Sequence, residues 1–451
     1  MTAQRFRETG RFKRPEPKTK FLTPSNLKEL MRCMDPDAGF PLPIRPQGTG
    51  SSSTDCNTTS VGTVIRTTGL DRILSIDTYN HTVTAEAGVH LGQLAAALAE
   101  QGLELIASPE QYDRTLGGAI AAPCFGPTAG QQAGCFSSHV ASMKMITTAG
   151  KVLKITPSQK HLLTAARSSY GLLGVIYEAT LNVRPISTFT ANHRRVSIEK
   201  FASAVDTIAR SDAGLKFYLM PYRSAVYLDL RRYDNSAEHS YRAPWKLKDW
   251  GESTVLPQVF KSLNRVVPIP SVRYRLIDSI SEATQGLVNT RLVRTGNHTS
   301  MGATHRKRRE PKRMLRSTWC FPAADFSIVL RAYHEFCLET LDVNGYRCDM
   351  PAVGFRIARD PASLLSPSFD EPMIALQSLS TQQKGWDDFV IDLAEFAEKW
   401  GGIPLFSESQ AMRAEYATQV YNNRLEFFRR LRRQLDPHNR LLNPRLAQCF
   451  S

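Results

Sequence analysis

The amino-acid sequence predicts an α/β or α+β protein built from two domains, or from one large α/β domain with insertions. The chain has 451 residues, which is too long for one ordinary hydrophobic core. Up to residue 184, short runs with the alternating pattern of strands are interspersed with short helical runs. Longer amphipathic helices then follow as far as Trp400. This change in character predicts that a second domain begins near residue 185.

The elements of the first domain follow an N-terminal arm. Residues 1–20 are basic and contain proline without hydrophobic periodicity, so we expect a flexible arm. Asn26 can cap a helix that begins at Leu27, because its side chain can accept a hydrogen bond from a free helical amide. A strand at 41–45 then leads into a loop of small residues. Further strands are expected at 63–66, 73–77, 81–87, 140–147 and 152–155, and a helix at 91–101.

The second domain combines long helices with strands. Its expected helices are 198–211, 324–341 and 386–400, and its clearest strands are 215–220 and 225–230. A basic helix pair is expected from Ser409 to Leu435, with one apolar face formed by Tyr421, Leu425, Phe428 and Leu431. The pair ends before Pro437, because proline disfavours helical geometry in the residue that precedes it.

The chain carries a net charge of +15, and its densest basic runs are residues 305–313 and the arm at 1–20. Such runs are most often solvated loops, and the alternative is contact with an anionic membrane surface or another polyanion. No zinc-finger pattern, aromatic ribonucleoprotein motif or basic-leucine heptad accompanies them. We therefore expect no nucleic-acid partner.

The sequence also bears on location and on metal binding. No run approaches the roughly 18 consecutive apolar residues that a membrane-spanning helix needs, and the N-terminus lacks an apolar signal segment. We expect a cytoplasmic protein, with peripheral contact to a membrane as the alternative. The eight cysteines are scattered without a C-x-x-C pair. This predicts reduced thiols, and neither a zinc site nor a disulfide framework.

Three glycine clusters are the most informative motifs. The first, at 48–53 (GTGSSS), follows a strand, and its small residues can bring backbone N–H groups and hydroxyls close to a pyrophosphate. Alone it is typical of ordinary turns, and it is not a P-loop because no Gly-Lys-Ser/Thr follows. The second lies at 115–121 (TLGGAIA) and the third at 170–176 (YGLLGVI). The three in this order are much more specific than any one of them.

With these motifs the sequence resembles the FAD-binding domain of the vanillyl-alcohol-oxidase/para-cresol-methylhydroxylase (PCMH) superfamily. Within it, the chain is similar to the sugar-lactone and alditol oxidases and to the decaprenylphosphoryl-ribose oxidases. The resemblance covers 45–183, the motif "FRIARDPASLLSP" that ends at Pro367, and "GGIP" with "LDPHNRLLNP" within 401–444. The middle, 187–351, has little to match.

The resemblance implies a two-subdomain PCMH-type FAD-binding domain with an inserted α+β substrate cap domain. The FAD-binding domain would comprise 21–184, the cap 185–405, and the C-terminal segment 406–451 would return to the FAD-binding domain. It implies an FAD-dependent oxidase or dehydrogenase that acts on a small-molecule substrate. The enzyme would oxidise an alcohol carbon of a sugar, lactone, polyol or hydroxy acid by hydride transfer to flavin N5. Oxygen or another carrier would accept the electrons.

The family's cofactor contacts fall on the three glycine clusters and their surroundings. Carried over to this chain, they are Gly48, Thr49, Gly50, Ser51, Ser52, Ser53, Thr115, Gly117, Gly118, Ala121, Ala122, Ser138, Gly174 and Ile176. The lactone and alditol oxidases attach FAD through a histidine in the first loop, where this chain has Ser51. A second attachment position seen in some relatives is occupied by Phe125. Because a serine hydroxyl cannot form the histidyl-flavin bond, the resemblance implies FAD bound without a covalent link.

The polar residues expected around the substrate depart from the family pattern. In lactone and alditol oxidases, a Glu-x-Arg strand and a lysine in a His-Trp-x-Lys motif supply them. Here Arg356 matches the arginine, but Gly354 replaces the glutamate. Leu405 replaces the histidine and Glu408 the lysine. We expect Glu408 to act as general base with Arg356 orienting a substrate oxygen or carboxylate. The alternatives are a structural ion pair between the two, or a register shift in this comparison.

Two other functions stay open at this point. One is the oxidase component of a lipid-linked sugar epimerase, in which the basic residues at 306–313 would approach a membrane surface or a phosphate. The other is a flavin-binding assembly factor, in which the altered site no longer catalyses a reaction.

Overall fold

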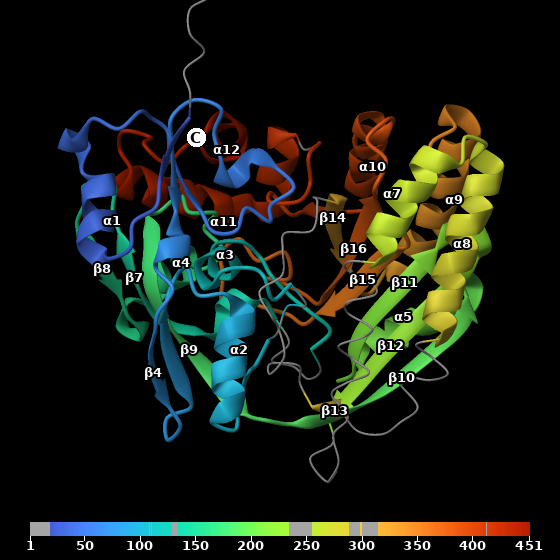
Figure 1. Cartoon of the computed structure of the whole chain (residues 1–451), viewed down its shortest axis with the longest axis horizontal. Coiled ribbons are helices and arrows are strands. Elements are labelled where there is room, and N and C mark those ends of the chain that lie inside the picture. Colours follow the sequence, from blue (N-terminus) through green and yellow to red (C-terminus); the bar gives the residue numbers. More distant parts are fainter. Residues whose placement is uncertain are drawn as a thin grey trace, which may run out of the picture.

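The computed structural model describes residues 19–107, 109, 111–128, 134–233, 255–287, 298–299, 314–411 and 413–451. Two lobes lie side by side, and the chain passes from the first to the second between β9 (Val175–Pro185) and β10 (Thr188–Ser197), as Figure 1 shows. Only the last two residues of the expected arm at 1–20 are among those described, and the basic run at 305–313 lies outside them. The mixture of helices and antiparallel strands confirms the predicted α+β class.

The first lobe contains two sheets. A parallel sheet has the strand order β1–β3–β2 and is formed by β1 (Lys20–Leu22), β2 (Ile44–Gln47) and β3 (Thr63–Arg66). An antiparallel sheet has the order β4–β5–β9–β7–β8, with β6 paired to β9. Its other strands are β4 (Ile73–Asp77), β5 (Thr82–Glu86), β6 (Leu103–Leu105), β7 (Val140–Ile146) and β8 (Val152–Ile155). The helices of this lobe are α1 (Leu27–Met34), α2 (Leu91–Glu100), α3 (Leu116–Ala121) and α4 (Lys160–Ala166).

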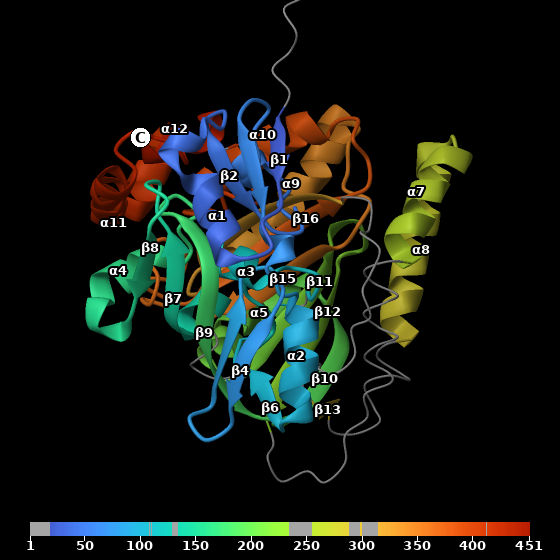
Figure 2. The same cartoon turned by 60° about the vertical axis from the view of Figure 1, so that its left-hand side comes forward.

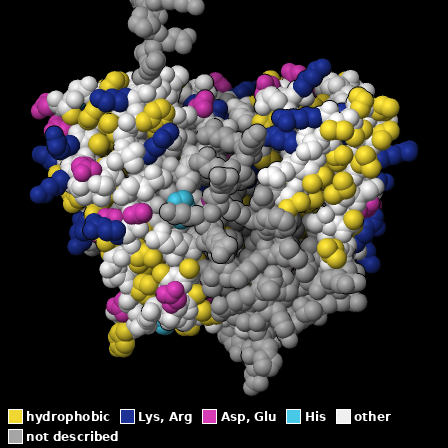
Figure 3. Space-filling view, in the orientation of Figure 1, with side chains coloured by type: hydrophobic (Ala, Val, Ile, Leu, Met, Phe, Trp, Pro, Cys, Tyr) yellow, Lys and Arg dark blue, Asp and Glu magenta, His cyan; other side chains and the backbone are white. Residues whose placement is uncertain are grey.

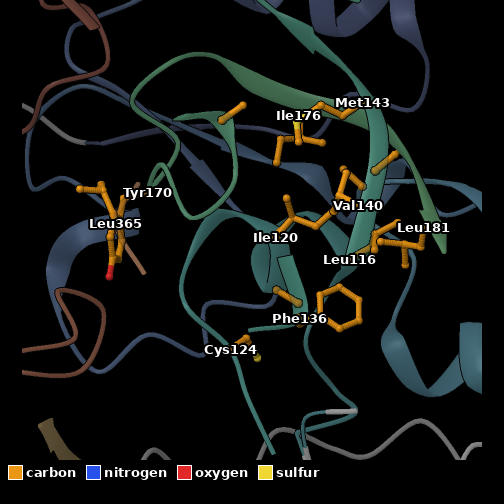
Figure 4. Packing of buried hydrophobic residues seen from close by; sticks show 14 of the residues in the cluster. Leu116, Ile120, Cys124, Phe136, Val140, Met143, Tyr170, Ile176, Leu181 and Leu365 are labelled. Atoms are coloured by element: carbon orange, nitrogen blue, oxygen red, sulfur yellow. The ribbon is translucent and has the colours of Figure 1, made fainter. Parts of the chain in front are cut away.

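The short helix α3 is held by apolar packing against the antiparallel sheet. Leu116 and Ile120 lie among Val140 and Met143 of β7 and Leu181 of β9, and all five are buried in one cluster (Figure 4). Apolar residues at a spacing of four lie on one side of a helix. Of the two glycines of α3, Gly117 is buried and faces Ala87, and Gly118 is half-buried.

The second lobe is built on an eight-stranded antiparallel sheet in the order β13–β10–β12–β11–β15–β16–β14–β17. Its strands after β10 are β11 (Gly214–Met220), β12 (Ala225–Tyr233), β13 (His298–Thr299), β14 (Leu315–Pro322), β15 (Ala352–Ile357), β16 (Met373–Ser380) and β17 (Ile403–Pro404). Its helices are α5 (Ile198–Arg210), α7 (Leu256–Val266), α8 (Pro270–Leu287), α9 (Phe326–Asn344) and α10 (Trp386–Lys399). We call this lobe the cap.

Alternation along the strands gives the cap sheet two distinct faces. Phe217 packs with α5, α9 and α10, whereas its neighbour Tyr218 packs with α7 and α8. The face that carries Tyr218 also reaches the first lobe, because Phe355 lies in the same cluster and its ring contacts the ring of Phe125, with centroids 6.1 Å apart. We call this the inner face of the cap.

The C-terminal segment packs on the first lobe, where α11 (Ala414–Leu435) and α12 (Pro444–Phe450) lie at the upper left of Figure 1. The expected helix pair is present, since Asn422 breaks α11 with a φ of 49°. Asp436 accepts hydrogen bonds from the backbone N–H groups of Arg440 and Leu441, both at 2.8 Å. These bonds shape the turn of the "LDPHNRLLNP" motif before α12 begins.

Among the described helices, none combines the length and the apolar character that crossing a bilayer requires. Within the same residues, no group of three or more His, Cys, Asp or Glu side chains is placed to hold a metal ion. All eight cysteines are buried free thiols.

Asn443 joins α12 to the loop after β2, which gives a first prediction. Its Nδ2 donates to the carbonyl oxygens of Asp55 at 2.7 Å and Thr58 at 2.8 Å, and its Oδ1 accepts from the N–H of Leu446 at 3.0 Å. We expect Asn443→Ala to lower the free energy of unfolding by about 2 kcal/mol, because a buried set of hydrogen bonds and a helix cap are lost. Urea denaturation of the purified protein measures this change.

The matched variant Asn443→Ser keeps an acceptor oxygen for the helix cap and loses the bonds that the amide donates to the two carbonyls. Its stability should therefore fall between those of the wild type and the alanine variant. An alanine variant with wild-type stability would show that these bonds do not secure the C-terminal helix.

Candidate functional site

A pocket with about 750 Å³ of empty space, its open mouth included, lies in the first lobe. All three glycine clusters contribute to its walls, although they are far apart in the sequence. The lining residues are Pro46, Gln47, Gly48, Thr49, Gly50, Ser51, Ser52, Cys56, Asn57, Thr67, Ala87, Arg114, Thr115, Gly117, Gly118, Ala121, Ala122, Tyr170, Gly171, Gly174, Ile176 and Ser407.

The first glycine cluster follows β2 and is fixed by the segment after β17. The hydroxyl of Ser52 donates to the carbonyl of Ser407 at 2.7 Å, and the hydroxyl of Thr54 donates to the carbonyl of Phe406 at 2.7 Å. A Cβ atom at Gly48 would lie 2.0 Å from Oγ1 of Thr115, so this position has no room for a side chain. The first and second clusters therefore approach each other as closely as their backbones allow.

The second cluster forms α3, whose first turn is capped by Thr115 through a bond from the N–H of Gly118 to its Oγ1 at 3.3 Å. A Cβ atom at Gly117 would lie 2.9 Å from Cβ of Ala87. In the third cluster, Gly174 has a φ of 151°, which only glycine adopts readily. The small residues are thus required by the way these segments meet.

The residues of this pocket fit FAD. Glycine, alanine, serine and threonine dominate the walls, so a ligand can reach backbone N–H groups and hydroxyls directly. The hydroxyl of Ser407 lines the pocket and, although buried, finds no hydrogen-bond partner among the described residues. A dinucleotide with several phosphate and ribose oxygens would satisfy such a group.

Glu408, next to this pocket, is buried in a dense hydrogen-bonded network. Its Oε1 accepts from Nη2 of Arg114 at 2.9 Å and from Nη1 of Arg316 at 3.3 Å. Its Oε2 accepts from the hydroxyl of Thr318 at 2.6 Å and from Nε2 of Gln377 at 3.2 Å. One carboxylate therefore joins the pocket wall to strands β14 and β16 of the cap.

The electrostatics of this network favour an ionised Glu408. Burial raises the pKa of its carboxyl, but Arg316, Arg114 and the hydrogen bond from Thr318 outweigh that effect and leave the pKa below its ordinary value. Nη1 of Arg114 also approaches the Sγ of Cys124 at 3.2 Å. Burial raises the pKa of that thiol, so Cys124 is held in its neutral form at physiological pH.

The structure contradicts the role predicted for Arg356. Its side chain lies on the opposite face of the cap sheet, where Nε donates to the carbonyl of Ala209 in α5 at 2.6 Å. Gly354 lies on the same face, and a Cβ there would meet the ring of Phe217 at 2.0 Å. The arginine partners of Glu408 are Arg114 and Arg316. The cause is strand alternation, which brings Phe355 and not Arg356 to the inner face.

Two predicted cofactor contacts are also placed elsewhere. The hydroxyl of Ser53 donates to the carbonyls of Arg316 and Glu408, both at 3.2 Å, so it ties the first cluster to the cap. The hydroxyl of Ser138 donates to Asp360 and borders a separate cavity. Neither residue lines the pocket. The other twelve predicted residues do.

Sequence reasoning missed Arg114 and Ser407, which line the pocket. Arg114 directly precedes Thr115, and Ser407 directly precedes Glu408, and both neighbours were predicted site residues. An arginine directly before a cluster that is expected to line the cofactor was a usable signal, because the guanidinium group is suited to binding phosphates and carboxylates.

Comparison with known proteins fits this architecture. The family model for an FAD binding domain matches residues 19–156, and that for D-arabinono-1,4-lactone oxidase matches residues 179–449, more than half of the chain. The chain belongs to the D-arabinono-1,4-lactone oxidase family. The expected cofactor, FAD, is confirmed by the first match.

Two curated relatives illustrate the family's range. The chain is similar to L-gulono-1,4-lactone dehydrogenase of Mycobacterium tuberculosis, with 31% identity over 40% of this chain and 41% of that protein. It is similar to decaprenylphosphoryl-beta-D-ribose oxidase of Mycolicibacterium smegmatis, with 36% identity over 32% of this chain and 31% of that protein. The matched region thus spans less than half the length of these relatives.

Solved structures confirm the predicted PCMH-type fold. Cholesterol oxidase from Brevibacterium sterolicum superposes with a TM-score of 0.74 at 12% identity, covering 96% of this chain and 94% of that one. Xylooligosaccharide oxidase from Myceliophthora thermophila superposes with a TM-score of 0.67 at 12% identity, covering 97% and 93%. At these identities the likeness concerns the fold alone.

The buried network predicts a pH-dependent contribution of Glu408 to stability. We expect Glu408→Gln to lower the free energy of unfolding at pH 7 by about 3 kcal/mol, because two arginines lose their buried counter-charge. Since the folded-state pKa of Glu408 is depressed, this contribution is fully present above the unfolded pKa of about 4.3 and declines as pH falls below it. Urea unfolding of both proteins from pH 7 down to acid conditions measures the difference.

The exposed Glu371 provides the control, because its substitution by glutamine removes a carboxylate without a buried partner. The gap between wild type and Glu408→Gln should narrow in acid, and the gap for Glu371→Gln should be small throughout. A Glu408→Gln gap that widens in acid would contradict the depressed pKa.

Proposed function

We propose that this protein is an FAD-dependent oxidoreductase that oxidises a CH–OH group of a sugar-type molecule, such as a sugar, lactone, polyol or hydroxy acid. The observation that carries the proposal is the junction at Arg114, whose guanidinium lines the FAD pocket and also binds Glu408. Glu408 is bound in turn by residues of the cap. A substrate held by the inner face of the cap would therefore lie beside the cofactor. The family, and the names of relatives that act on lactones and on a ribose, support the substrate class.

Twelve residues are proposed to hold FAD in the pocket. They are Gly48, Thr49, Gly50, Ser51, Ser52, Thr115, Gly117, Gly118, Ala121, Ala122, Gly174 and Ile176. We infer that they hold it without a covalent bond, because Ser51 stands where the family's attaching histidine would be and a serine hydroxyl cannot make that bond. Arg114 and Ser407 extend the set with a charge and a free hydroxyl.

The chain's own polar groups suggest how the site works. Bound FAD supplies the acceptor for the hydride. Arg114 places a fixed positive charge in the pocket wall, which can stabilise the negative charge that develops on the substrate oxygen as the hydroxyl proton passes to solvent. Because the Glu408 carboxylate accepts four hydrogen bonds and has a lowered pKa, we assign it the positioning of Arg114 in place of the general-base role expected from the sequence.

We infer that oxygen or another carrier accepts the electrons from the reduced flavin. The lipid-linked epimerase component is not favoured, because the family model that matches residues 179–449 is that of a lactone oxidase. The assembly factor is not favoured either, since the pocket keeps the small residues that FAD binding needs.

An anaerobic bleaching screen tests the proposed activity. The yellow protein is mixed with lactones, alditols, hydroxy acids and polyprenyl sugars, and flavin absorbance is followed. We expect a sugar-type compound to bleach the flavin, and Arg114→Met to slow bleaching by about a hundredfold with FAD still bound. The exposed Arg430→Met is the control and should bleach at the wild-type rate. Failure of every compound to bleach the wild-type flavin would overturn the proposal.

The mode of FAD attachment has a separate test. After acid precipitation, we expect the flavin to stay in the supernatant and the pellet to be colourless. The reason is that the first loop has no histidine that could hold the flavin by a covalent bond. Absorbance of both fractions, and the mass of the intact chain, measure this. A yellow pellet with a chain heavier by one flavin would contradict non-covalent binding.

A further inference from the structure

Helices α7 and α8 expose an apolar stripe on the surface of the cap. Among the large apolar side chains of this hairpin, Val266 is 76% exposed, Ile269 58%, Leu287 53%, Val272 46% and Leu276 42%. Figure 2 shows α7 and α8 as the outermost layer of the cap, and Figure 3 shows hydrophobic side chains gathered on the same side of the molecule. Soluble monomers rarely leave a contiguous patch of this kind uncovered.

The stripe follows the helical repeat of α8. Val272, Leu276, Ala283 and Leu287 are exposed and stand four, seven and four residues apart, a spacing that places them on one side of a helix. The opposite side is buried, and Ile277 packs there against Phe260 of α7 and the inner face of the cap. The buried side of α8 is otherwise polar, with Asp278, Ser281 and Gln285, so the large apolar side chains of this helix lie mainly on its outward face.

The charged side chains of the hairpin are also divided between its two sides. Asp278 pairs with Arg347, and with Arg223 at 3.5 Å, and Glu282 pairs with Arg195 at 3.3 Å. Arg265 and Arg275 are exposed, and neither forms an ion pair with a described residue. The carboxylates are neutralised by the body of the cap, so the outward surface of the hairpin is apolar and cationic.

The combination of apolar and cationic side chains indicates which kind of partner covers this surface. We propose that the outward face of α7–α8 is a docking surface for an anionic lipid bilayer, with the apolar stripe in the acyl-headgroup boundary and Arg265 and Arg275 at the lipid phosphates. A second copy of the chain fits less well, because Asp278 and Glu282, the carboxylates of the described hairpin, are already paired and leave no partner for these arginines across a two-fold contact. The net charge of +15 favours approach to an anionic surface over a long range. The inference goes beyond the proposed redox function and does not depend on it.

Vesicle sedimentation with the full-length, FAD-loaded protein tests the proposal. We expect binding to phosphatidylcholine vesicles that contain phosphatidylglycerol and little binding to phosphatidylcholine alone. The triple variant V272S/L276S/L287S should bind about tenfold more weakly or worse, and R265E/R275E should lose binding similarly. The matched control is I328S/L338S/V343S, which removes three equally exposed apolar side chains from α9 and should bind like the wild type.

A depth measurement separates docking by the stripe from attraction through basic segments elsewhere in the chain. Tryptophan placed by Leu276→Trp should be quenched by brominated lipid, whereas Val343→Trp on α9 should not. Flavin content and Tm of each variant confirm folding.

Several outcomes would overturn the proposal. They are absence of binding by the wild type, wild-type binding by the stripe variant, equal quenching at both tryptophans, or a dimer in light scattering that the stripe variant dissociates.

Discussion

The guanidinium group of Arg45 is the interaction on which the first lobe most depends. It is buried, and it donates to the carbonyl of Cys56 at 2.9 Å and to the carbonyls of Tyr170 and Leu441. Burial lowers its pKa to about 10, so the group stays charged at neutral pH. A buried charge is tolerated because each of the three guanidinium nitrogens donates to a carbonyl oxygen. The three carbonyls belong to the loop after β2, the third glycine cluster and the C-terminal motif, so one side chain holds together the segments that form or support the pocket.

A second constraint acts where the two lobes meet. The segment 405–410 receives hydrogen bonds from Ser52 and Thr54 of the first loop, and Glu408 at its centre receives them from Arg114, Thr318 and Gln377. The pocket wall and the cap are thus fixed to the same short segment. Any displacement of the cap would have to break a buried ion pair, which is costly when only one partner is removed. The substrate region therefore has a defined position relative to the cofactor pocket.

The sequence was informative where the backbone itself sets the requirement. Gly48 and Gly117 have no space for a side chain, so the close approach of two segments leaves a visible mark in the residue type. The cofactor pocket and most of its lining could be predicted for this reason. The face on which a strand residue lies left no such mark in the sequence. Successive side chains of a strand lie on opposite faces of the sheet, so an error of one position exchanges the faces. This is why Arg356 was expected in the site, whereas Phe355 occupies the inner face. The partners of Glu408 were equally hidden, since Arg114 and Arg316 lie 294 and 92 residues away along the chain.

The hydrogen bonds that three side chains of the first loop donate to segment 405–410 end on its main chain. Ser52, Ser53 and Thr54 donate from their side chains, but the acceptors are main-chain carbonyls of Phe406, Ser407 and Glu408. Every residue type carries such a carbonyl. During divergence of homologous proteins, the hydroxyl residues at 52–54 should therefore drift slowly, whereas these bonds set no requirement on the side chains at 406–408. Selection on those side chains comes from their own contacts instead, namely the core around Phe406 and the arginines around Glu408. The main-chain bonds thus permit a glutamate at 408, where the family resemblance implies a lysine.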